Sequence, residues 1–265
     1  MDVRRLVRGT VDWERLEQVV RELAERYGRE TVHVEFLEAD NWLSTPLVVD
    51  RELFVKVISI QNVLVHGVFT GARNLGAVTA GTEHLFEHCG TPLEMAEREL
   101  EATRRMRAVG VNAPEPIEAF EVDGLGVLVL EYLPEFLTLD ELDDETAAAF
   151  APTVFESLAI MHEDGLAHGD LRAENVLVAG GELYFVDATT VRDRARAAAR
   201  SYDIASALAM LAPRIGAHEA VAAARPHYSG EDLIAARDFL DFVSLRPDHD
   251  FDAQRVKGEV EKAAA

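Results

Sequence analysis

The stretch HGDLRAENVLVAGGELYFVD, from His168 to Asp187, constrains the fold of this chain more than any other. It opens with a polar cluster around Asp170, passes through Asn175 into a short apolar run, turns at two glycines and ends a second apolar run on Asp187. Short apolar runs separated by glycines predict a tight β-hairpin that follows a loop. Such a hairpin would bring two carboxylates and one amide to the same spot. Oxygen ligands of this kind suit Mg²⁺, which is usually shared with substrate phosphates.

Taken singly, Asp170, Asn175 and Asp187 could each be an ordinary turn residue, because Asp and Asn are common where strands begin and end. Their order in one stretch resembles the catalytic and metal-binding loops of the protein-kinase-like superfamily. The HGD form is similar to that of RIO kinases, of the small archaeal kinase of the KEOPS tRNA-modification complex, and of aminoglycoside and choline phosphotransferases. The resemblance implies that Asp170 orients or deprotonates an acceptor hydroxyl, and that Asn175 and Asp187 hold Mg²⁺ on the phosphates of ATP. Ala188 and Thr189 stand where the eukaryotic pattern has Phe and Gly.

Alternating apolar and polar residues predict an antiparallel sheet in the first half of the chain. The alternation starts at Thr31, and three strands are indicated, the last being the run LFVKVISI from Leu53 to Ile60. A further hairpin with a turn at Asp123 and Gly124 would complete five strands. From Asp144 onward, helical spacing of apolar residues dominates, apart from the hairpin already described.

The expected fold class is therefore α+β. Together with the resemblance, the pattern indicates a two-lobed protein-kinase-like fold, with an antiparallel five-stranded sheet and one main helix in the N-lobe and a mostly helical C-lobe. The expected domains are an N-terminal helix packed on the small lobe (residues 1–30), the kinase N-lobe (31–131) with an insertion (61–92), and the kinase C-lobe (134–265).

Lys56 lies inside an apolar run, where an ammonium without a partner would cost several kcal/mol of desolvation. A lysine on a strand edge whose tip reaches solvent is the alternative. Glu99 falls on the apolar stripe of the helix predicted between Leu93 and Val109, so it is the expected partner, with Glu101 as the reserve. By the resemblance, the pair matches the kinase lysine that contacts the α- and β-phosphates and the glutamate of the following helix.

The loop between the first two predicted strands, ADNWLSTP from Ala39 to Pro46, has no glycine. Kinases of the usual type place a GxGxxG loop at this point. The phosphates would then be covered by backbone amides of the loop and by Ser44 or Thr45.

A second nucleotide contact is implied by the run Glu131 to Leu133, which is followed by Pro134 and resembles a kinase hinge. Backbone groups at Glu131 and Leu133 would bind the adenine edge. Arg172, two residues after Asp170, could add positive charge at the γ-phosphate, or it could be an ordinary exposed arginine.

The insertion at 61–92 includes the mostly apolar segment from Val63 to Gly81. Its length is unusual for a connection within a compact domain. It could form a docking surface for a protein partner, a nucleotide lid, or an additional helix packed on the small lobe. His84, His88 and Cys89 have a spacing compatible with a metal, but no fourth ligand is apparent and a zinc site is not expected.

Two further features concern the second half of the chain. Thr138 and Glu141 form a capping-box pattern ahead of the long helix predicted from Asp144 to His162, in which Pro152 would introduce a kink or a restart. Asp203 resembles the aspartate that braces the catalytic loop from beneath, although an exposed first-turn acid is equally compatible with the pattern.

The net charge of −22 arises from 48 acidic against 26 basic residues. Such an excess, with Arg preferred to Lys, is what a halophilic protein, kept soluble in concentrated salt, would show; an ordinary acidic cytosolic protein is the alternative. The charge disfavours direct binding to nucleic acid or an anionic membrane. With one cysteine, no signal-peptide pattern and no apolar run of membrane-spanning length, a cytoplasmic location is expected.

The expected function is an ATP-dependent phosphotransferase: a RIO-like atypical serine/threonine protein kinase, or an ATPase, that uses Mg-ATP and acts on a protein or small-molecule acceptor. A nucleotide-gated ATPase that regulates the binding of a partner is the first alternative, because little chain is left for a peptide-docking segment after Asp187. A small-molecule kinase of the aminoglycoside or choline phosphotransferase type is the second.

Overall fold

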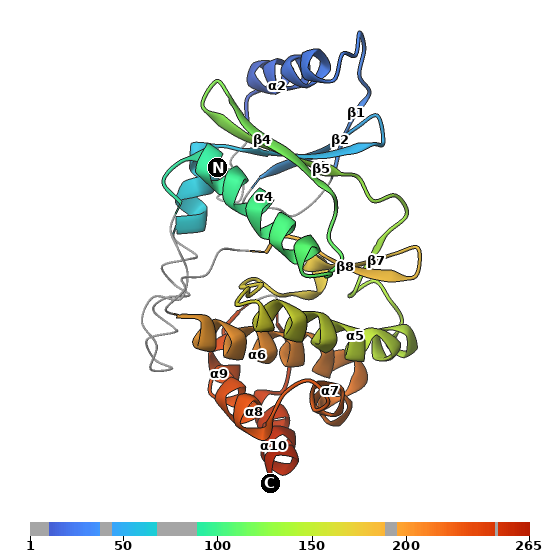
Figure 1. Cartoon of the computed structure of the whole chain (residues 1–265), viewed down its shortest axis with the longest axis vertical. Helices are drawn as coiled ribbons and strands as arrows, with labels where there is room; N and C mark the ends of the chain where they lie inside the picture. The colour runs from blue at the N-terminus through green and yellow to red at the C-terminus, as the bar shows by residue number, and fades with distance from the viewer. Residues whose placement is uncertain (1–10, 38–43, 68–88, 189–194, 247–248) are drawn as a thin grey trace, which may run out of the picture. The chain divides into compact units, whose positions relative to one another are not determined.

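The computed structural model describes residues 11–37, 44–67, 89–188, 195–246 and 249–265 (Figure 1). The chain divides into two compact units. The first unit comprises Met1–Ala72, His88–Arg104 and Pro114–Pro134, and the second unit comprises Arg73–Glu87, Arg105–Ala113 and Glu135–Ala265. Among the described residues, none of the helices combines the length and apolar character needed to cross a lipid bilayer.

An antiparallel five-stranded sheet in the order β1-β2-β3-β5-β4 forms the first unit, which confirms the predicted fold class (Figure 1). Its strands are β1 Val34–Phe36, β2 Thr45–Val49, β3 Leu53–Ile58, β4 Pro116–Val122 and β5 Leu125–Glu131. Two hairpins turn through pairs of residues with positive φ, Asp50 with Arg51 and Asp123 with Gly124. Such pairs are typical of the tight turns whose twist matches that of the flanking strands.

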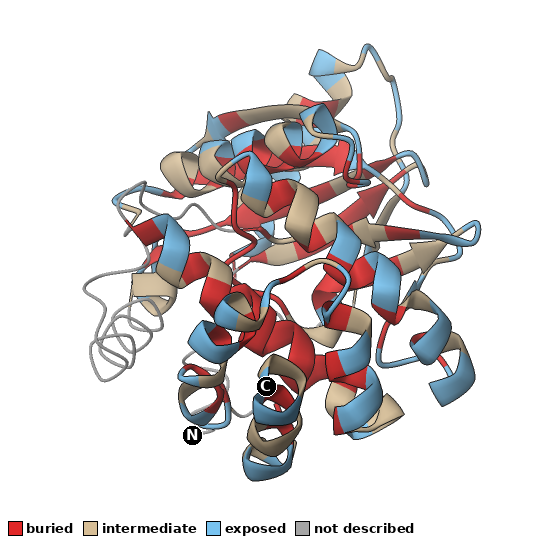
Figure 2. Ribbon diagram, turned by 60° about the horizontal axis from the view of Figure 1, so that its bottom comes forward, coloured by how far each residue is buried: buried red, intermediate tan, exposed pale blue. Residues whose placement is uncertain are grey.

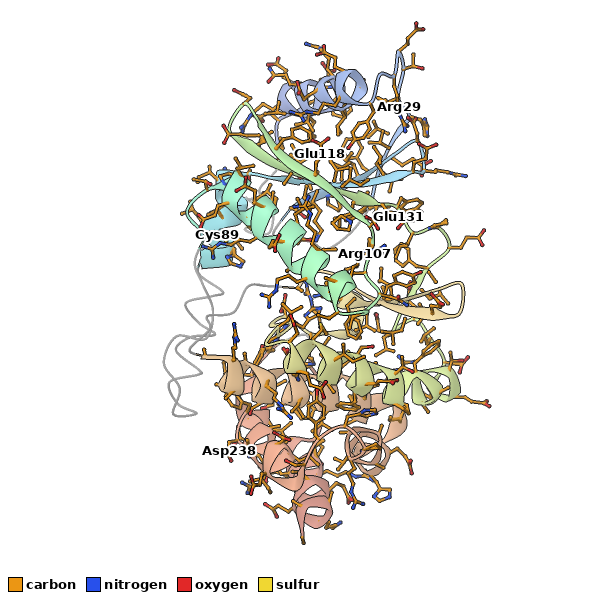
Figure 3. The ribbon with its side chains drawn as sticks, viewed as in Figure 1. Arg29, Cys89, Arg107, Glu118, Glu131 and Asp238 are labelled. Atoms are coloured by element: carbon orange, nitrogen blue, oxygen red, sulfur yellow. The ribbon has the colours of Figure 1, made fainter. Side chains whose placement is uncertain are left out.

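Successive side chains along each strand point to opposite faces of the sheet, so the first unit has a hydrophobic cluster on each face. Helix α2, Trp13–Arg26, covers one face through Leu16, Val19 and Leu23. At its end Arg26 and Tyr27 bond the carboxylate of Glu118, which points from β4 toward the helix (Figure 3). The other face packs against helix α4, Pro92–Ala108.

Gly126 of β5 lies where α4 begins. A Cβ at this position would stand 2.1 Å from the carbonyl oxygen of Pro92, so only glycine permits the helix to approach the strand this closely. The position of the start of α4, and of the face of α4 that carries Glu99, therefore depends on glycine having no side chain at residue 126.

The strand predicted to run to Ile60 ends instead at Ile58, and residues 60–67 are helical. The reason is a local cap: the Ser59 N–H donates to Asn62 Oδ1 over 2.8 Å, and the Asn62 N–H donates to Ser59 Oγ over 3.3 Å. This reciprocal pair satisfies donors at a helix start, which the apolar pattern of the strand could not indicate. Of the predicted insertion, residues 68–88, including His84 and His88, lie outside the described residues.

The described part of the second unit combines a small three-stranded sheet, in the order β6-β7-β8, with a layer of helices. Its elements are β6 Leu137–Thr138, α5 Asp144–Glu163, η1 Ala173–Asn175, β7 Val176–Ala179, β8 Glu182–Phe185, α6 Arg196–Ile215, α7 Ala217–Ala224, α8 Gly230–Arg237, α9 Leu240–Val243 and α10 Ala253–Ala264. Helix α6 is buried without interruption from Ser201 to Leu211 and forms the centre of this unit (Figure 2). This mostly helical arrangement agrees with the expectation for the C-terminal part.

The prediction that Thr138 and Glu141 cap the start of α5 was wrong. Thr138 and Glu141 do bond one another, but Thr138 belongs to β6. The N-cap is Asp143, whose Oδ1 accepts from the Thr146 N–H over 2.7 Å. The helix also continues through Pro152 as one element.

Candidate active site

Lys56 and Glu99 form an ion pair within the first unit. The Nζ and Oε1 atoms are 2.6 Å apart, and the two side chains are 6% and 14% exposed. The pair forms because Lys56 alternates with the residues of β3 that face α2, so its side chain emerges on the α4 face. Glu101, the reserve candidate, is exposed. The predicted ion pair between Lys56 and Glu99 is therefore present in the structure. The contact of Lys56 with nucleotide phosphates stays a prediction.

Ser44 and Thr45, the two side chains predicted to bind phosphate, lie at the start of β2. Ser44 is 7% exposed, and its Oγ has no hydrogen-bond partner within the described residues. A buried hydroxyl without a partner costs free energy, so it suits a ligand that brings an acceptor oxygen. Thr45 is the first residue of β2 and pairs with Val57. The preceding loop residues, 39–43, lie outside the described part of the chain.

At the predicted hinge, the backbone of β5 is already partly engaged. The Glu131 N–H donates to Glu115 O over 2.9 Å, and the Tyr132 N–H donates to Glu52 O over 2.9 Å. The Glu131 N–H is therefore unavailable to adenine. Leu133 follows the strand and is 9% exposed, and the adenine contact of these two residues stays a prediction.

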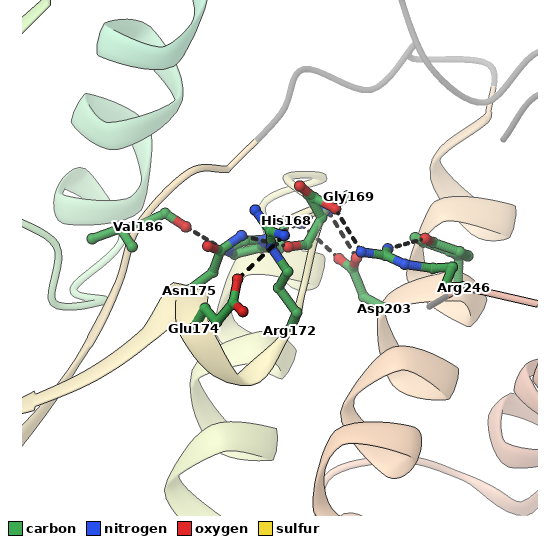
Figure 4. Close-up of polar contacts among 10 residues, drawn as sticks. His168, Gly169, Arg172, Glu174, Asn175, Val186, Asp203 and Arg246 are labelled. Carbon is green, nitrogen blue, oxygen red and sulfur yellow. Dashed lines mark hydrogen bonds and ion pairs between the residues drawn. The ribbon is translucent and has the colours of Figure 1, made fainter. Parts of the chain in front are cut away.

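The loop that carries Asp170 is held from beneath by Asp203, a fully buried carboxylate on α6. Its Oδ2 accepts from the His168 N–H over 2.6 Å, and its Oδ1 accepts from the Gly169 N–H over 2.8 Å (Figure 4). His162 Nε2 also lies 3.1 Å from Oδ2. Bonds from backbone N–H groups to a buried carboxylate fix the loop's conformation. The brace expected from the resemblance is present, and the exposed alternative for Asp203 was wrong.

His168 is buried completely, and its ring connects the loop to the end of the hairpin. Nε2 lies 3.0 Å from Val186 O, and Nδ1 lies 3.4 Å from the Asp170 N–H. These contacts fit a neutral ring with its proton on Nε2 and an acceptor at Nδ1. Burial lowers the pKa of His168, against the opposing attraction of neighbouring carboxylates, led by that of Asp203.

The hairpin brings the main chain at Asp187 close to that at Asn175, and their joint role as cation ligands stays a prediction. The Val186 N–H donates to Asn175 O over 3.0 Å, which places Asp187 next to Asn175. Asn175 Nδ2 donates to Asp170 O over 2.8 Å, so the amide oxygen is the end left for a cation. Asp187 has a φ of 62°, a strained conformation for a residue other than glycine and one that recurs at functional sites.

The donor set fits Mg²⁺ better than a metal that needs a full protein cage. Asn175 and Asp187 offer oxygen atoms, and no group of three or more His, Cys, Asp or Glu suited to a metal occurs among the residues the structure describes. Mg²⁺ binds through one or two protein oxygens when phosphates and waters complete its shell.

Two arginines lie at the loop that carries Asp170. Arg172 Nη1 lies 3.3 Å from Glu174 Oε2. A different arginine, Arg246, contacts the candidate base: its Nη2 is 3.0 Å from Asp170 Oδ1. The two residues are 76 positions apart, and no periodicity or motif connects them. Arg246 is the site residue that sequence reasoning missed, and the catalytic role of Arg172 stays a prediction.

Comparisons with known proteins find similar sequences and a similar fold. The RIO domain family matches residues 85–202, which include Glu99, Asp170, Asn175 and Asp187. The KEOPS complex subunit Bud32 of Pyrococcus abyssi is 35% identical over 98 residues, which are 36% of this chain and 43% of that protein. The chain has a protein-kinase-like fold with a RIO-like domain. The similarity to the RIO domain family is carried by residues 85–202, which are less than half of the chain.

Two further matches are more distant. A "probable bifunctional tRNA threonylcarbamoyladenosine biosynthesis protein" of Methanothermobacter thermautotrophicus is 28% identical over 90 residues, or 34% of this chain and 16% of that protein. A solved "putative fructosamine-3-kinase" from Haemophilus somnus 129PT has a TM-score of 0.51 at 13% identity, covering 94% of this chain and 98% of that one. The matched segments thus span less than half the length of both curated relatives, and the structural likeness concerns the fold.

Proposed function

We propose that this chain is an ATP-dependent phosphotransferase, an atypical serine/threonine protein kinase or ATPase of the RIO type that uses Mg-ATP. The observation that carries the proposal is the braced loop of the second unit, in which Asp203 holds the backbone that presents Asp170. Asn175 bonds the same loop, and the hairpin places Asp187 beside it. An acid, an amide and a second acid in this order match the base and the two metal ligands of kinase-type phosphoryl transfer.

Each residue has one role in the proposal. Asp170 accepts a hydrogen bond from the acceptor hydroxyl and takes its proton as the new oxygen–phosphorus bond forms. The bond between the γ-phosphorus and the β-phosphate oxygen breaks at the same time, and its electron pair leaves with ADP. Asn175 and Asp187 would hold Mg²⁺, which neutralises charge on the phosphates when it is bound.

The first unit supplies the phosphate contacts. Lys56, oriented by Glu99, would bind the α- and β-phosphates, since a fixed ammonium beside an anion favours a charged ligand. Ser44 would donate its unpartnered hydroxyl to a phosphate oxygen. Leu133 and the carbonyl of Glu131 would bind the adenine edge.

The test compares the wild-type protein with Asp187→Ala and with Asp238→Ala, a change at a 62% exposed carboxylate. Purified protein is incubated with γ-³²P-labelled ATP, Mg²⁺ and a cell extract, in dilute and in molar salt. We expect label on protein for the wild type and for Asp238→Ala, and none for Asp187→Ala. Turnover by Asp187→Ala equal to that of the wild type would reject the proposed metal site and the function built on it.

A second candidate function is a nucleotide-gated ATPase that controls the binding of a protein partner. It is favoured by the match to a protein described as a subunit of the KEOPS complex. The same experiment separates the candidates, because free phosphate without labelled protein indicates the ATPase. Label on a small metabolite would instead indicate a small-molecule kinase.

A further inference from the structure

The candidate base Asp170 is held by a second residue pair outside the sequence motif. Arg246 Nη2 lies 3.0 Å from Asp170 Oδ1, and the side chains of Arg246 and Asp170 are 11% and 5% exposed. Arg246 Nη1 donates to the hydroxyl of Tyr202 over 2.6 Å, and Tyr202 is fully buried on α6. Figure 4 shows the Arg246 guanidinium reaching the loop next to Asp203. Arg246 thus links a catalytic carboxylate to the central helix of the unit.

This link is built into the packing of α9 on α6. The ring of Tyr202 packs against Phe239 and Phe242, with centroids 6.2 Å and 5.8 Å apart. One turn later, the Arg246 N–H bonds Val243 O over 3.0 Å, which continues the helical path of α9. The aromatic contacts therefore determine where the guanidinium can reach.

Two consecutive residues of α6 then hold the same loop in two ways. Asp203 binds the backbone at His168 and Gly169. Tyr202 holds Arg246, and Arg246 holds the side chain of Asp170. A guanidinium presents donors in a rigid fork, so two partners restrict its orientation strongly.

We propose that Arg246 is the positioning residue of Asp170, an inference that rests on the proposed phosphotransfer function. By engaging Oδ1, Arg246 restricts rotation of the carboxylate and so orients it for the acceptor hydroxyl. An uncompensated carboxylate would be costly in this buried site, and the guanidinium of Arg246 offsets that cost. Arg172 is turned toward Glu174 and leaves this role to Arg246.

The test measures initial rates against ATP concentration for the wild type, Arg246→Ala, Arg246→Lys and Tyr202→Phe. Misdirection of a catalytic group by about 1 Å costs roughly 100-fold, so kcat of Arg246→Ala should fall by about that factor. The KM for ATP should stay within about twofold, because the contacts that hold ground-state nucleotide are unchanged. Arg246→Lys should regain part of kcat, and added methylguanidinium should raise the rate of Arg246→Ala.

Tyr202→Phe keeps the ring that packs on Phe239 and removes only the hydroxyl, so kcat should fall less than in Arg246→Ala. Arg255→Ala, at an exposed arginine of α10, is the matched control and should equal the wild type in rate. Melting curves identify any variant that fails to fold. Should Arg246→Ala fail, Arg246→Lys and Tyr202→Phe still decide the question through kcat.

The outcomes separate this inference from the function beneath it. An active wild type with equally active Arg246 and Tyr202 variants overturns the positioning role alone. A rate increase in Arg246→Ala overturns it in favour of a blocking contact. A wild type that turns over no Mg-ATP in any salt condition overturns the proposed function and this inference with it.

Discussion

Replacing Lys56 by Met tests the buried pair with Glu99 most directly. At 2.6 Å, two unit charges attract by about 6 kcal/mol at an effective dielectric constant of ~20. Desolvation of two ions, at several kcal/mol each, offsets that attraction, so the net contribution of the pair is small. Removal of one partner is different, because Glu99, at 14% exposure, would lose the ammonium of Lys56.

We therefore expect Lys56→Met to lower the free energy of unfolding of the first unit by about 2–3 kcal/mol, below the 3–5 kcal/mol of a fully buried pair because Glu99 keeps some solvent contact. Glu99→Leu should cost a similar amount. The double variant should be at least as stable as either single variant, a coupling of about 2–3 kcal/mol.

Urea unfolding followed by tryptophan fluorescence suits this measurement, because Trp13 lies on α2 of the first unit. The control cycle uses Arg51 and Glu35, whose charged atoms are 3.6 Å apart with side chains 78% and 43% exposed. That exposed pair should couple by under about 0.5 kcal/mol.

Additive losses in the Lys56 and Glu99 cycle, or no loss in Lys56→Met, would refute the account of a buried pair. The same variants also test nucleotide binding. Saturating Mg-ATP should raise the unfolding midpoint of the wild type, since it binds only the folded state, and should raise that of Lys56→Met less.

Four further outcomes are expected. Gly126→Ala should cost about 3 kcal/mol or more, because its Cβ would meet the Pro92 carbonyl at 2.1 Å; a melting temperature equal to that of the wild type would contradict the close approach. Asp203→Asn should destabilise by about 2–4 kcal/mol by weakening bonds to buried backbone N–H groups, measured against the exposed Asp238→Asn. Burial lowers the pKa of His168, so stability present above pH ~6.5 should be lost as the pH falls through the folded-state pKa, by up to about 1.4 kcal/mol per pH unit. His168→Asn should flatten that dependence in urea titrations between neutral and mildly acidic pH, and an unchanged slope would speak against a neutral buried ring. The charge of −22 predicts a melting temperature that rises from dilute buffer to molar potassium chloride, where the screening length shrinks from ~30 Å to ~3 Å; a flat salt series would remove the halophilic interpretation.

Local periodicity was sufficient for the parts of the site that neighbouring residues create. A period of two along β3 places Lys56 on one face, and the helical period of α4 places Glu99 on the stripe that meets that face. The hairpin between Asn175 and Asp187 followed from two glycines between apolar runs. In each case the side-chain direction depends on residues within one or two turns of the chain, so the sequence was enough to predict the pairing.

Boundaries and caps were less predictable. Strand β3 ends before Ser59, because the Ser59 hydroxyl accepts a hydrogen bond from the Asn62 N–H at the start of a helix. The N-cap of α5 is Asp143, and not Thr138 as the sequence pattern predicted. Several Ser, Thr and Asp residues could have served, and the geometry of the preceding turn selected among them.

The sequence by itself determined the fold class, the order of the site motifs and the identity of the ion pair, because these depend on short repeating patterns of apolar and polar residues. Only the tertiary structure decided that Asp203 is buried beneath the catalytic loop and that Arg246 reaches Asp170. Both outcomes depend on how α9 and the loop pack against α6, through aromatic contacts such as Tyr202 with Phe242. A contact across 76 residues has no local signature, since its energy arises only when distant segments exclude water together.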